Sequence, residues 1–406
     1  MAMRDRTIDT LALSLAGASL AAWAILATAR GRFWDVGSAP HAAGPDEAAH
    51  RPAIEAIVPA RNEAATIGTT VASLLEQRYG GHFHVTVVDD QSSDGTAALA
   101  RHAAAGSNAE ASLDVIAARP LQRPWTGKLN ALATGMAHVA ARRGRPDYWL
   151  FTDADITHHP GNVAELAIRM QGADCDLVSL MVRLHCESRW ERLLVPAFVF
   201  FFRKLYPFAW SNDPRRRTAA AAGGCILIRD RALERIGGLD AIAGELIDDC
   251  ALAAAVKASG GRIDLSLSAR TISTRTYDAL APLWAMVKRT AFTQLQRSYS
   301  FTGLAVAIML LLYLAPPVLA VAGILRRNAP LAATAASAWA IMAALYVPTL
   351  RLYGRPARES LALPLAALLY TLMTVDSALA ESRGTGGRWK GRTYGAGAAE
   401  GAPTTA

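Results

Sequence analysis

Acidic side chains follow three short apolar runs in the first half of this chain of 406 residues. These acids are Glu63, Asp89 with Asp90, and Asp153 with Asp155. Carboxylates at the end of a buried strand can hold a hard divalent cation such as Mg²⁺ or Mn²⁺, or accept hydrogen bonds from a nucleotide. Because ligands of open α/β sheets bind at the carboxyl ends of the strands, three such endings together predict one binding site.

Asp153 and Asp155 are separated by one residue, so both side chains point the same way in an extended segment. Their position directly after the apolar run 148–152 predicts ligands for a divalent cation that also holds a diphosphate. A solvated turn is the alternative explanation for such a pair. Asp89 and Asp90 have two explanations as well, since they could bind a base or ribose or could form a helix-capping cluster.

Alternating strands and helices must position these acids. Strands are predicted at residues 53–59, 85–88, 113–117 and 148–152, and helices at residues 64–77, 96–105 and 128–142. This alternation predicts an α/β domain, Rossmann-like, with a mostly parallel sheet and helices on both faces. We assign the domain to residues 51–300.

Four long apolar stretches outside this domain explain why 52% of the residues are hydrophobic and only 19% are charged. The stretches are Ile8–Ala29, Gly303–Leu325, Ala329–Leu350 and Leu361–Ala380. About 20 apolar residues suffice for one membrane crossing. They predict an N-terminal anchor in residues 1–30 and transmembrane or interfacial helices in residues 301–380. A basic, flexible tail is expected at residues 381–406.

The net charge of +8 fits an anionic membrane surface and a diphosphate ligand, and we expect no nucleic-acid partner. Arg30 and Arg32 after the first anchor, and the basic tail around Arg388, Lys390 and Arg392, favour the cytoplasmic side. Three full crossings after the domain would place this tail outside. One late segment is therefore expected not to span, and the last one, which contains Asp376, is a candidate for an interfacial or re-entrant piece.

An aromatic patch interrupts the central domain at Leu193–Trp210, where basic residues accompany the rings. Such a segment is typical of a helix in the headgroup zone of a membrane. An ordinary aromatic core helix explains it equally well, and the sequence leaves both interpretations open. The four cysteines are scattered without a C-x-x-C pair, which excludes a disulfide scaffold.

Several motifs resemble those of family 2 glycosyltransferases, which have the GT-A fold and use nucleotide-diphospho-sugar donors. The matching segments are Ile57–Glu63 (IVPARNE), Val87–Thr96 (VVDDQSSDGT), Gly127–Leu132 (GKLNAL) and Asp153–Asp155 (DAD). Further on, Gly223–Arg229 resembles the acceptor-side glycine loop of the family. Asp248–Leu252 resembles its E-D-x-x-L motif, with Asp248 in place of the usual Glu.

The resemblance implies a role for each matching residue. Pro59, Glu63, Asp89 and Asp90 would line the nucleoside pocket, Lys128 would approach the diphosphate, and Asp153 with Asp155 would hold Mg²⁺ or Mn²⁺. Asp249 would be the general base that removes the proton from the acceptor hydroxyl, with inversion at the anomeric carbon. A helix N-cap is the alternative explanation for Asp249.

The family's Q-x-x-R-W motif is present only in part. Gln294 and Arg297 match it and would lie near the donor, whereas Ser298 replaces the Trp, which argues against a processive polysaccharide synthase. A solvated helix face is the alternative for these two residues. The tail segment Trp389–Tyr394 resembles that of members with lipid acceptors. The run Arg123–Lys128 is similar to that of the hopene-associated subgroup, which implies a bacterial, hopanoid-related setting.

The resemblance therefore implies an inverting sugar transfer from a nucleotide diphosphate donor, expected to be a UDP-sugar, to a lipid acceptor. The catalytic domain would face the cytoplasm at the bacterial inner membrane. A nucleotidyltransferase is one alternative, although Pro59–Glu63 lacks the Gly-rich basic loop that such enzymes usually need. A non-catalytic membrane scaffold that only binds nucleotides is the other.

Overall fold

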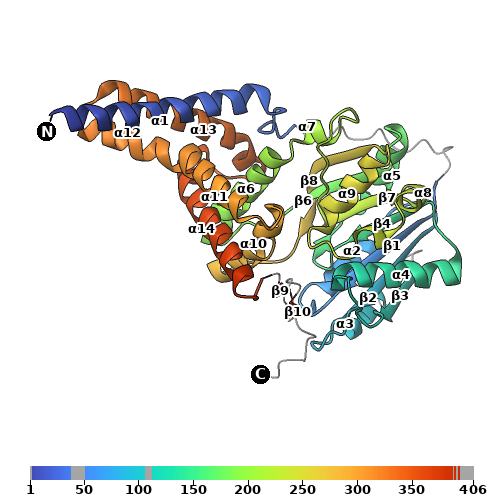
Figure 1. The fold of residues 1–406 in the computed structure, drawn as a ribbon. Coiled ribbons are helices and arrows are strands. Elements are labelled where there is room, and N and C mark those ends of the chain that lie inside the picture. Colours follow the sequence, from blue (N-terminus) through green and yellow to red (C-terminus); the bar gives the residue numbers. More distant parts are fainter. Residues whose placement is uncertain (1, 38–50, 106–111, 387, 390–391, 394–406) are drawn as a thin grey trace. The chain divides into compact units, whose positions relative to one another are not determined.

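The computed structural model describes residues 2–37, 51–105, 112–386, 388–389 and 392–393 (Figure 1). Most of the predicted tail, including Lys390, lies outside the described residues. The chain forms two compact units. We call residues 37–185 and 208–276 the sheet unit, and residues 1–36, 186–207 and 277–406 the helical unit.

An eight-stranded sheet forms the centre of the sheet unit. Its strands are β1 Ile54–Ala60, β2 Phe83–Asp89, β3 Ser112–Ala117, β4 Tyr148–Thr152, β5 Ile156–Thr157, β6 Leu177–Arg183, β7 Cys225–Arg229 and β8 Ile263–Ser273. They lie in the order β3-β2-β1-β4-β7-β6-β8-β5. The run β3, β2, β1, β4 is parallel, as is the pair β6 and β8, and the other pairings are antiparallel. The predicted mostly parallel α/β sheet is confirmed.

Helices cover both faces of this sheet. They are α2 Ile67–Leu75, α3 Thr96–Ala104, α4 Gly127–Arg143, α5 Asn162–Gly172, α7 Phe208–Ser211, α8 Asp230–Arg235, the short 3-10 helix η1 Leu239–Ile242, and α9 Asp248–Ala258. On one face, apolar side chains of α2 and α5 share a buried core with alternate residues of β1 and β2. On the other, α4 lies so close that a Cβ on Gly135 would be 2.7 Å from the side chain of Ile57 and 2.9 Å from that of Val88.

The loops that follow β1 and β2 are tied together by their own polar groups. The backbone N–H of Asn62 donates to Ser92 Oγ over 2.9 Å, and Asn62 Oδ1 accepts from the N–H of Ser93 at 2.9 Å. The N–H of Glu63 donates to Thr96 Oγ1 over 2.8 Å. Asn62 has a φ of 50°, a left-handed conformation that Asn tolerates better than most residues. Glu63, in the loop after β1, is thus held beside the loop that follows Asp89, the last residue of β2.

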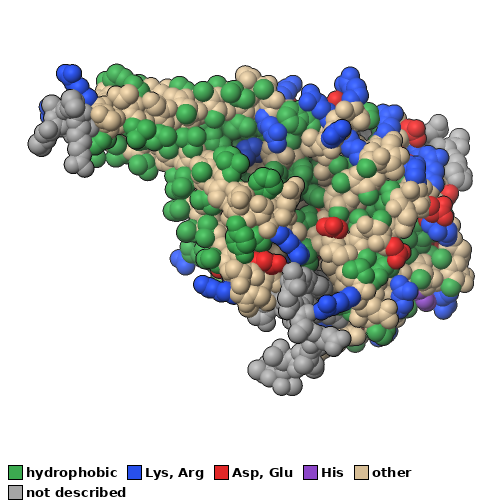
Figure 2. Space-filling model, in the orientation of Figure 1, with side chains coloured by type: hydrophobic (Ala, Val, Ile, Leu, Met, Phe, Trp, Pro, Cys, Tyr) green, Lys and Arg blue, Asp and Glu red, His purple; other side chains and the backbone are tan. Residues whose placement is uncertain are grey.

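The helical unit contains α1 Ala2–Ala29, α6 Arg189–Leu205, α10 Leu280–Gln294, α11 Tyr299–Met309, the π-helical segment η2 Leu310–Leu314, α12 Ala315–Leu325, α13 Ala329–Leu352, the 3-10 helix η3 Ala357–Ala362, and α14 Leu363–Ser382. The short strands β9 Arg388–Trp389 and β10 Arg392–Thr393 pair with each other. Five helical stretches of the described chain are long and apolar enough to cross a membrane: residues 6–29, 189–211, 299–325, 329–352 and 357–382. Hydrophobic side chains line the surface of α1, α11 and α12 (Figure 2).

The paired prolines after η2 leave a carbonyl without its helical partner, and α1 supplies one. Pro316 has no N–H, so the carbonyl of Leu312, four residues earlier, loses its usual donor. The buried indole of Trp23 donates to this Leu312 carbonyl over 2.8 Å. Proline inside a helix favours a kink, and the structure contains a five-residue π-helical segment directly before this pair.

An acid inside the last apolar stretch is explained by α10. Asp376 of α14 accepts hydrogen bonds from Trp284 Nε1 at 2.8 Å and Lys288 Nζ at 2.9 Å. One residue later, Ser377 Oγ accepts from the N–H of Phe292 at 3.0 Å and donates to the Lys288 carbonyl. Polar bonds therefore fix α14 along α10, and the charge of Asp376 is paired within the helical unit.

Candidate active site

A lysine at the start of α4 joins acids from two other elements of the sheet unit. Lys128 Nζ lies 2.9 Å from Asp153 Oδ1, which follows β4, and 3.2 Å from Asp248 Oδ2 at the start of α9. Burial alone would lower the pKa of Lys128, but the charges of Asp153, Asp248 and Asp249 together raise it above its ordinary value. The ammonium group is therefore a permanent positive charge among carboxylates. Such a group can bind a diphosphate.

Asp249 lies beside this lysine and is oriented by backbone groups. Its Oδ2 accepts from the N–H of Gly223 and its Oδ1 from the N–H of Cys250, each at 2.8 Å. Burial and the neighbouring charge of Asp248 raise the pKa of Asp249 to about 6, against the opposing effect of Lys128. A partly buried carboxylate with such a pKa can accept a proton near neutral pH. The N-cap residue of α9 is Ile247, and Asp249 lies within the first turn, where its carboxylate also accepts from the Cys250 N–H.

The charged groups of the site approach the backbone of Gly223 closely. A Cβ at this position would lie 3.0 Å from Lys128 Nζ and 3.3 Å from Asp249 Oδ2. The next residue, Gly224, accepts at its carbonyl from Thr152 Oγ1 over 2.8 Å, which ties this loop to the end of β4. The predicted glycine loop, the lysine motif and the D-x-D segment therefore meet at one edge of the sheet.

Each acid of the D-x-D pair already contacts a cation of the chain. Asp153 is paired with Lys128, while Asp155 Oδ2 accepts from Arg275 Nε at 2.7 Å. Among the described residues, no group of three or more His, Cys, Asp or Glu side chains could hold a metal ion. The chemistry of the donor set nevertheless fits Mg²⁺ or Mn²⁺, because these ions can be bound by one or two carboxylates together with substrate phosphates. Asp153 is partly exposed and remains approachable.

Arg275 is a site residue that the motif analysis missed. Its guanidinium reaches Asp155 and also both carboxylate oxygens of Glu63, each at 2.7 Å. Arg275 follows the end of β8 by two residues, so the rule that ligands bind at strand ends could have found it. Burial and the charge of Asp153 raise the pKa of Asp155 above its ordinary value, and Arg275 opposes this effect.

The predicted nucleoside residues surround the ends of β1 and β2. Pro59 is the next-to-last residue of β1 and lies in register with Val88 of β2. Asp90 is buried, and its carbonyl accepts from Arg61 Nη1 at 2.6 Å. Within the described structure, the buried Oδ1 atom of Asp89 has no hydrogen-bond partner, while its Oδ2 accepts weakly from the N–H of Ser92. An unpaired buried acceptor at a strand end is a candidate contact for a ligand hydroxyl or N–H.

The two histidines that follow the D-x-D pair serve the scaffold. His158 is buried between Thr152 Oγ1 and Asn162 Nδ2, with both contacts at 2.9 Å. Burial lowers its pKa to about 3, so the ring is neutral. His159 instead lies 3.4 Å from Glu165.

Gln294 and Arg297 belong to the helical unit. Gln294 Nε2 donates to the hydroxyl of Tyr206 over 2.7 Å. Arg297 lies in the turn after α10 with a φ of 53°, and its N–H donates to the Phe292 carbonyl. This geometry explains both residues as parts of the turn between α10 and α11, and their role at a donor stays a prediction.

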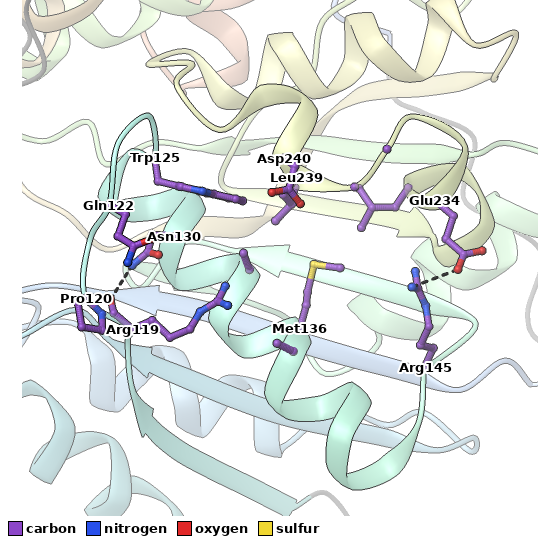
Figure 3. Close-up of a pocket in the computed structure, with 15 residues that line it drawn as sticks. Arg119, Pro120, Gln122, Trp125, Asn130, Met136, Arg145, Glu234, Leu239 and Asp240 are labelled. Carbon is purple, nitrogen blue, oxygen red and sulfur yellow. Dashed lines mark hydrogen bonds and ion pairs between the residues drawn. The ribbon is translucent and has the colours of Figure 1, made fainter.

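A cavity of about 850 Å³ lies on the outer face of α4 (Figure 3). Its wall includes Trp125, Asn130 and Met136 on one side and Leu239 and Asp240 on the other. None of the predicted site residues lines it. Next to the cavity, the N–H of Thr126 donates to the Ala243 carbonyl over 2.9 Å. The convergence around Lys128, rather than this cavity, carries the chemistry argued above.

Residues 55–237 match the family described as Glycosyl transferase family 2. The structure is similar to that of the mannosyltransferase PcManGT from Pyrobaculum calidifontis, solved in complex with GDP-Man and Mn²⁺: the TM-score is 0.52 at 21% identity, covering 90% of this chain and 98% of that one. A glucosyl-3-phosphoglycerate synthase of Mycobacterium tuberculosis aligns with a TM-score of 0.38 at 21% identity, over 61% of this chain and 80% of that one. No curated protein matches the chain.

Residues 55–237 are therefore similar to glycosyl transferase family 2, and the sheet unit has the GT-A fold.

Proposed function

We propose that this protein is a membrane-bound inverting glycosyltransferase, which transfers a sugar from a nucleotide diphosphate donor to a lipid hydroxyl. The observation that carries the proposal is the convergence of Lys128, Asp153 and Asp249 at the strand ends. It combines a fixed cation for a diphosphate with a carboxylate whose pKa suits proton transfer. The match of residues 55–237 to family 2 supports the same reaction class.

Asp249 is the general base in this mechanism. Two backbone N–H groups fix its carboxylate, and a nearby acceptor hydroxyl loses its proton to it as the oxygen attacks the anomeric carbon. One direct displacement inverts that carbon. The departing nucleoside diphosphate gains negative charge, which the ammonium group of Lys128 stabilises.

The donor's nucleoside occupies the loops after β1 and β2, beside Pro59, Glu63, Asp89 and Asp90. The unpaired Asp89 Oδ1 atom supports this assignment, because a ribose hydroxyl or base N–H would satisfy it. A UDP-sugar is the donor that we propose. GDP-Man, which is bound in the solved mannosyltransferase, is the alternative donor. An assay with a panel of nucleotide sugars distinguishes the two donors.

A divalent cation fits the carboxylates of Asp153 and Asp155. When bound, it would supply positive charge to the donor's diphosphate. One oxygen of Asp153 is paired with the ammonium group of Lys128, and the side chain is partly exposed. Its carboxylate can therefore bind a cation without unfolding of the loop. The Mn²⁺ in the structure of the mannosyltransferase supports this part of the proposal.

We propose that the helical unit crosses the membrane three times and that its other helices lie on the membrane surface. Contacts between its helices support this topology. The side chain of Asp9 near the start of α1 pairs with Arg326 at the end of α12, so these two helices run in opposite directions. At the other end of α1, Arg30 donates to the carbonyls of Lys204 and Leu205 in α6. With α13 returning from α12, the crossings are α1, α11 to α12, and α13.

In this arrangement α6 and α14 lie along the membrane surface on the side of the sheet unit. The chain enters α6 from the sheet unit and returns to the sheet unit after it. A helix that crossed the membrane once would place its two ends on opposite sides, so α6 does not cross. The hydroxyl of Tyr370 in α14 donates to the carbonyl of Leu194 in α6, and Asp376 binds α10. Figure 1 shows α14 running across the direction of α1, α12 and α13. Residues after Ser382 then stay on the catalytic side, which we propose is the cytoplasm of a bacterium.

This topology is tested by single cysteines in a variant whose native cysteines are replaced by alanine. A cysteine at exposed Thr385 should react with a membrane-impermeant maleimide in inverted vesicles and not in intact spheroplasts. A cysteine at Arg327, after α12, should show the opposite pattern. Labelling of both positions from one side would contradict three crossings.

Proximity to the bilayer explains how a lipid acceptor would be presented, and a cyclic triterpenoid is the acceptor class that we propose. The decisive experiment incubates the purified full chain in detergent with a panel of nucleotide sugars, bacterial lipid extract, and Mn²⁺ or Mg²⁺. We expect nucleoside diphosphate release that a chelator abolishes, together with a glycosylated lipid. No release with any donor, alongside retained nucleotide binding, would favour the scaffold instead.

A further inference from the structure

Three consecutive residues at the end of β8 hold Asp155, one of the two acids of the D-x-D pair. Ser273 Oγ lies 3.3 Å from Asp155 Oδ2, and Thr274 donates through its N–H and its hydroxyl to the Asp155 carbonyl at 2.8 and 3.0 Å. Arg275 Nε completes the set at 2.7 Å from Oδ2. Asp155 is only 8% exposed. Its carboxylate is therefore enclosed by protein groups rather than left open to water.

Arg275 is itself anchored on the other side. Its Nη2 atom reaches both oxygens of Glu63 at 2.7 Å, so one guanidinium bridges two acids that lie 92 positions apart in the sequence. A lysine has no planar fork, so it could not hold Asp155 with one nitrogen while a second nitrogen contacts both oxygens of Glu63. If the bond to Asp155 breaks, the contact with Glu63 still keeps the guanidinium in the site.

A guanidinium this close to Asp155 occupies the acid that a divalent cation would use, and it repels a second positive charge at short range. We propose that Arg275 competes with the divalent cation for Asp155, so that the cation binds firmly only together with the donor's diphosphate. When Arg275 leaves Asp155 it loses a carboxylate partner, and the negatively charged diphosphate replaces that partner. This inference rests on the proposed function for the identity of the donor, but not for the cation measurement itself.

The test is a Mn²⁺ titration of the full chain in detergent without nucleotide, followed by the electron paramagnetic resonance signal of free Mn²⁺. Arg275→Gln should bind Mn²⁺ about tenfold more tightly than the unmodified protein, within the usual range for coupled sites. Saturating UDP or GDP should reduce the difference in Mn²⁺ affinity between Arg275→Gln and the unmodified protein, because either diphosphate draws Arg275 away from Asp155 in the unmodified protein.

Arg270→Gln is the matched control, since Arg270 lies on β8, five residues before Arg275, but pairs with Glu165. It should leave the Mn²⁺ affinity unchanged. If Arg275→Gln fails to fold, Arg275→Lys tests the proposal in its place. This variant keeps the positive charge but loses the bridge between Asp155 and Glu63, and it should bind Mn²⁺ several-fold more tightly than the unmodified protein. Unchanged Mn²⁺ affinity in the folded variant, with or without diphosphate, overturns the competition.

The two proposals fail separately. Absence of nucleoside diphosphate release from every nucleotide sugar contradicts the transferase but leaves the comparison of Mn²⁺ affinities valid. Equal Mn²⁺ affinities contradict the role of Arg275, whatever the turnover.

Discussion

The backbone N–H of Gly223 donates to Asp249 Oδ2 over 2.8 Å, although 26 residues separate the two along the chain. This bond fixes one oxygen of the carboxylate, and the Cys250 N–H fixes the other. An acid that is oriented at both oxygens loses little conformational freedom when it accepts a proton. The loop before β7 and the first turn of α9 thus build one proton-accepting group together.

Replacing Asp249 by asparagine should reduce turnover at least about a hundredfold, because the amide keeps the shape but cannot accept the acceptor's proton. Initial rates of nucleoside diphosphate release measure the effect. Asp240→Asn is a matched control, since Asp240 lines the cavity on the outer face of α4 and should retain full activity. Turnover of Asp249→Asn at the unmodified rate would contradict the assignment of the base.

The pH dependence should follow the pKa of Asp249, which burial and Asp248 raise to about 6. A base acts only when deprotonated, so kcat/KM should fall as the pH drops through about 6 and should level off above it. In Asp248→Asn the neighbouring negative charge is gone, and the acid limb of the profile should move to lower pH. An acid limb that stays in place would show that another group controls it.

Gly223→Ala should lower activity strongly while the protein remains folded. The added methyl group would lie 3.0 Å from Lys128 Nζ and 3.3 Å from Asp249 Oδ2, so both charged groups must shift. We expect a loss of about a hundredfold for such a displacement. Gly172→Ala, with open space around its Cβ at the end of α5, is the control that should remain active. Equal activity of the two variants would argue against a close approach at Gly223.

Ser188→Ala should weaken the helical unit. Ser188 forms a capping box with Glu191 at the start of α6, and its hydroxyl also donates to the Tyr277 carbonyl over 2.7 Å. Loss of such a cap costs about 1 kcal/mol of the free energy of unfolding. Thermal unfolding in detergent measures the change, with exposed Ser382→Ala as the control. An unfolding temperature equal to that of the control would mean that the cap contributes nothing.

The strands and the positions of the acids were predictable because they depend on local patterns. The predicted run 53–59 became β1 at Ile54–Ala60, and the acids after β1, β2 and β4 follow from strand ends. The helix after β1 begins later than predicted, at Ile67, because the N–H groups of Thr66 and Ile67 both bond to the Glu63 carbonyl in a turn.

What depends on distant partners was not predictable. A strand-end rule points to the position of Arg275 but not to its two acidic partners, which come from loops more than 100 residues earlier. The indole of Trp23, which donates to the Leu312 carbonyl in the π-helical segment, likewise comes from the other end of the chain. Pattern and propensity contain no information about such partners.

The position of α6 in the chain has a consequence for how the sheet unit could be separated from the apolar helices. Residues 37–185 and 208–276 build the sheet unit, and the 17 residues of α6 lie between them. Proteolysis that removed both termini would still leave this apolar helix inside the surviving fragment, and cutting it out would divide the sheet. Trimming from the two ends alone therefore cannot separate the residues of the sheet unit from this apolar helix.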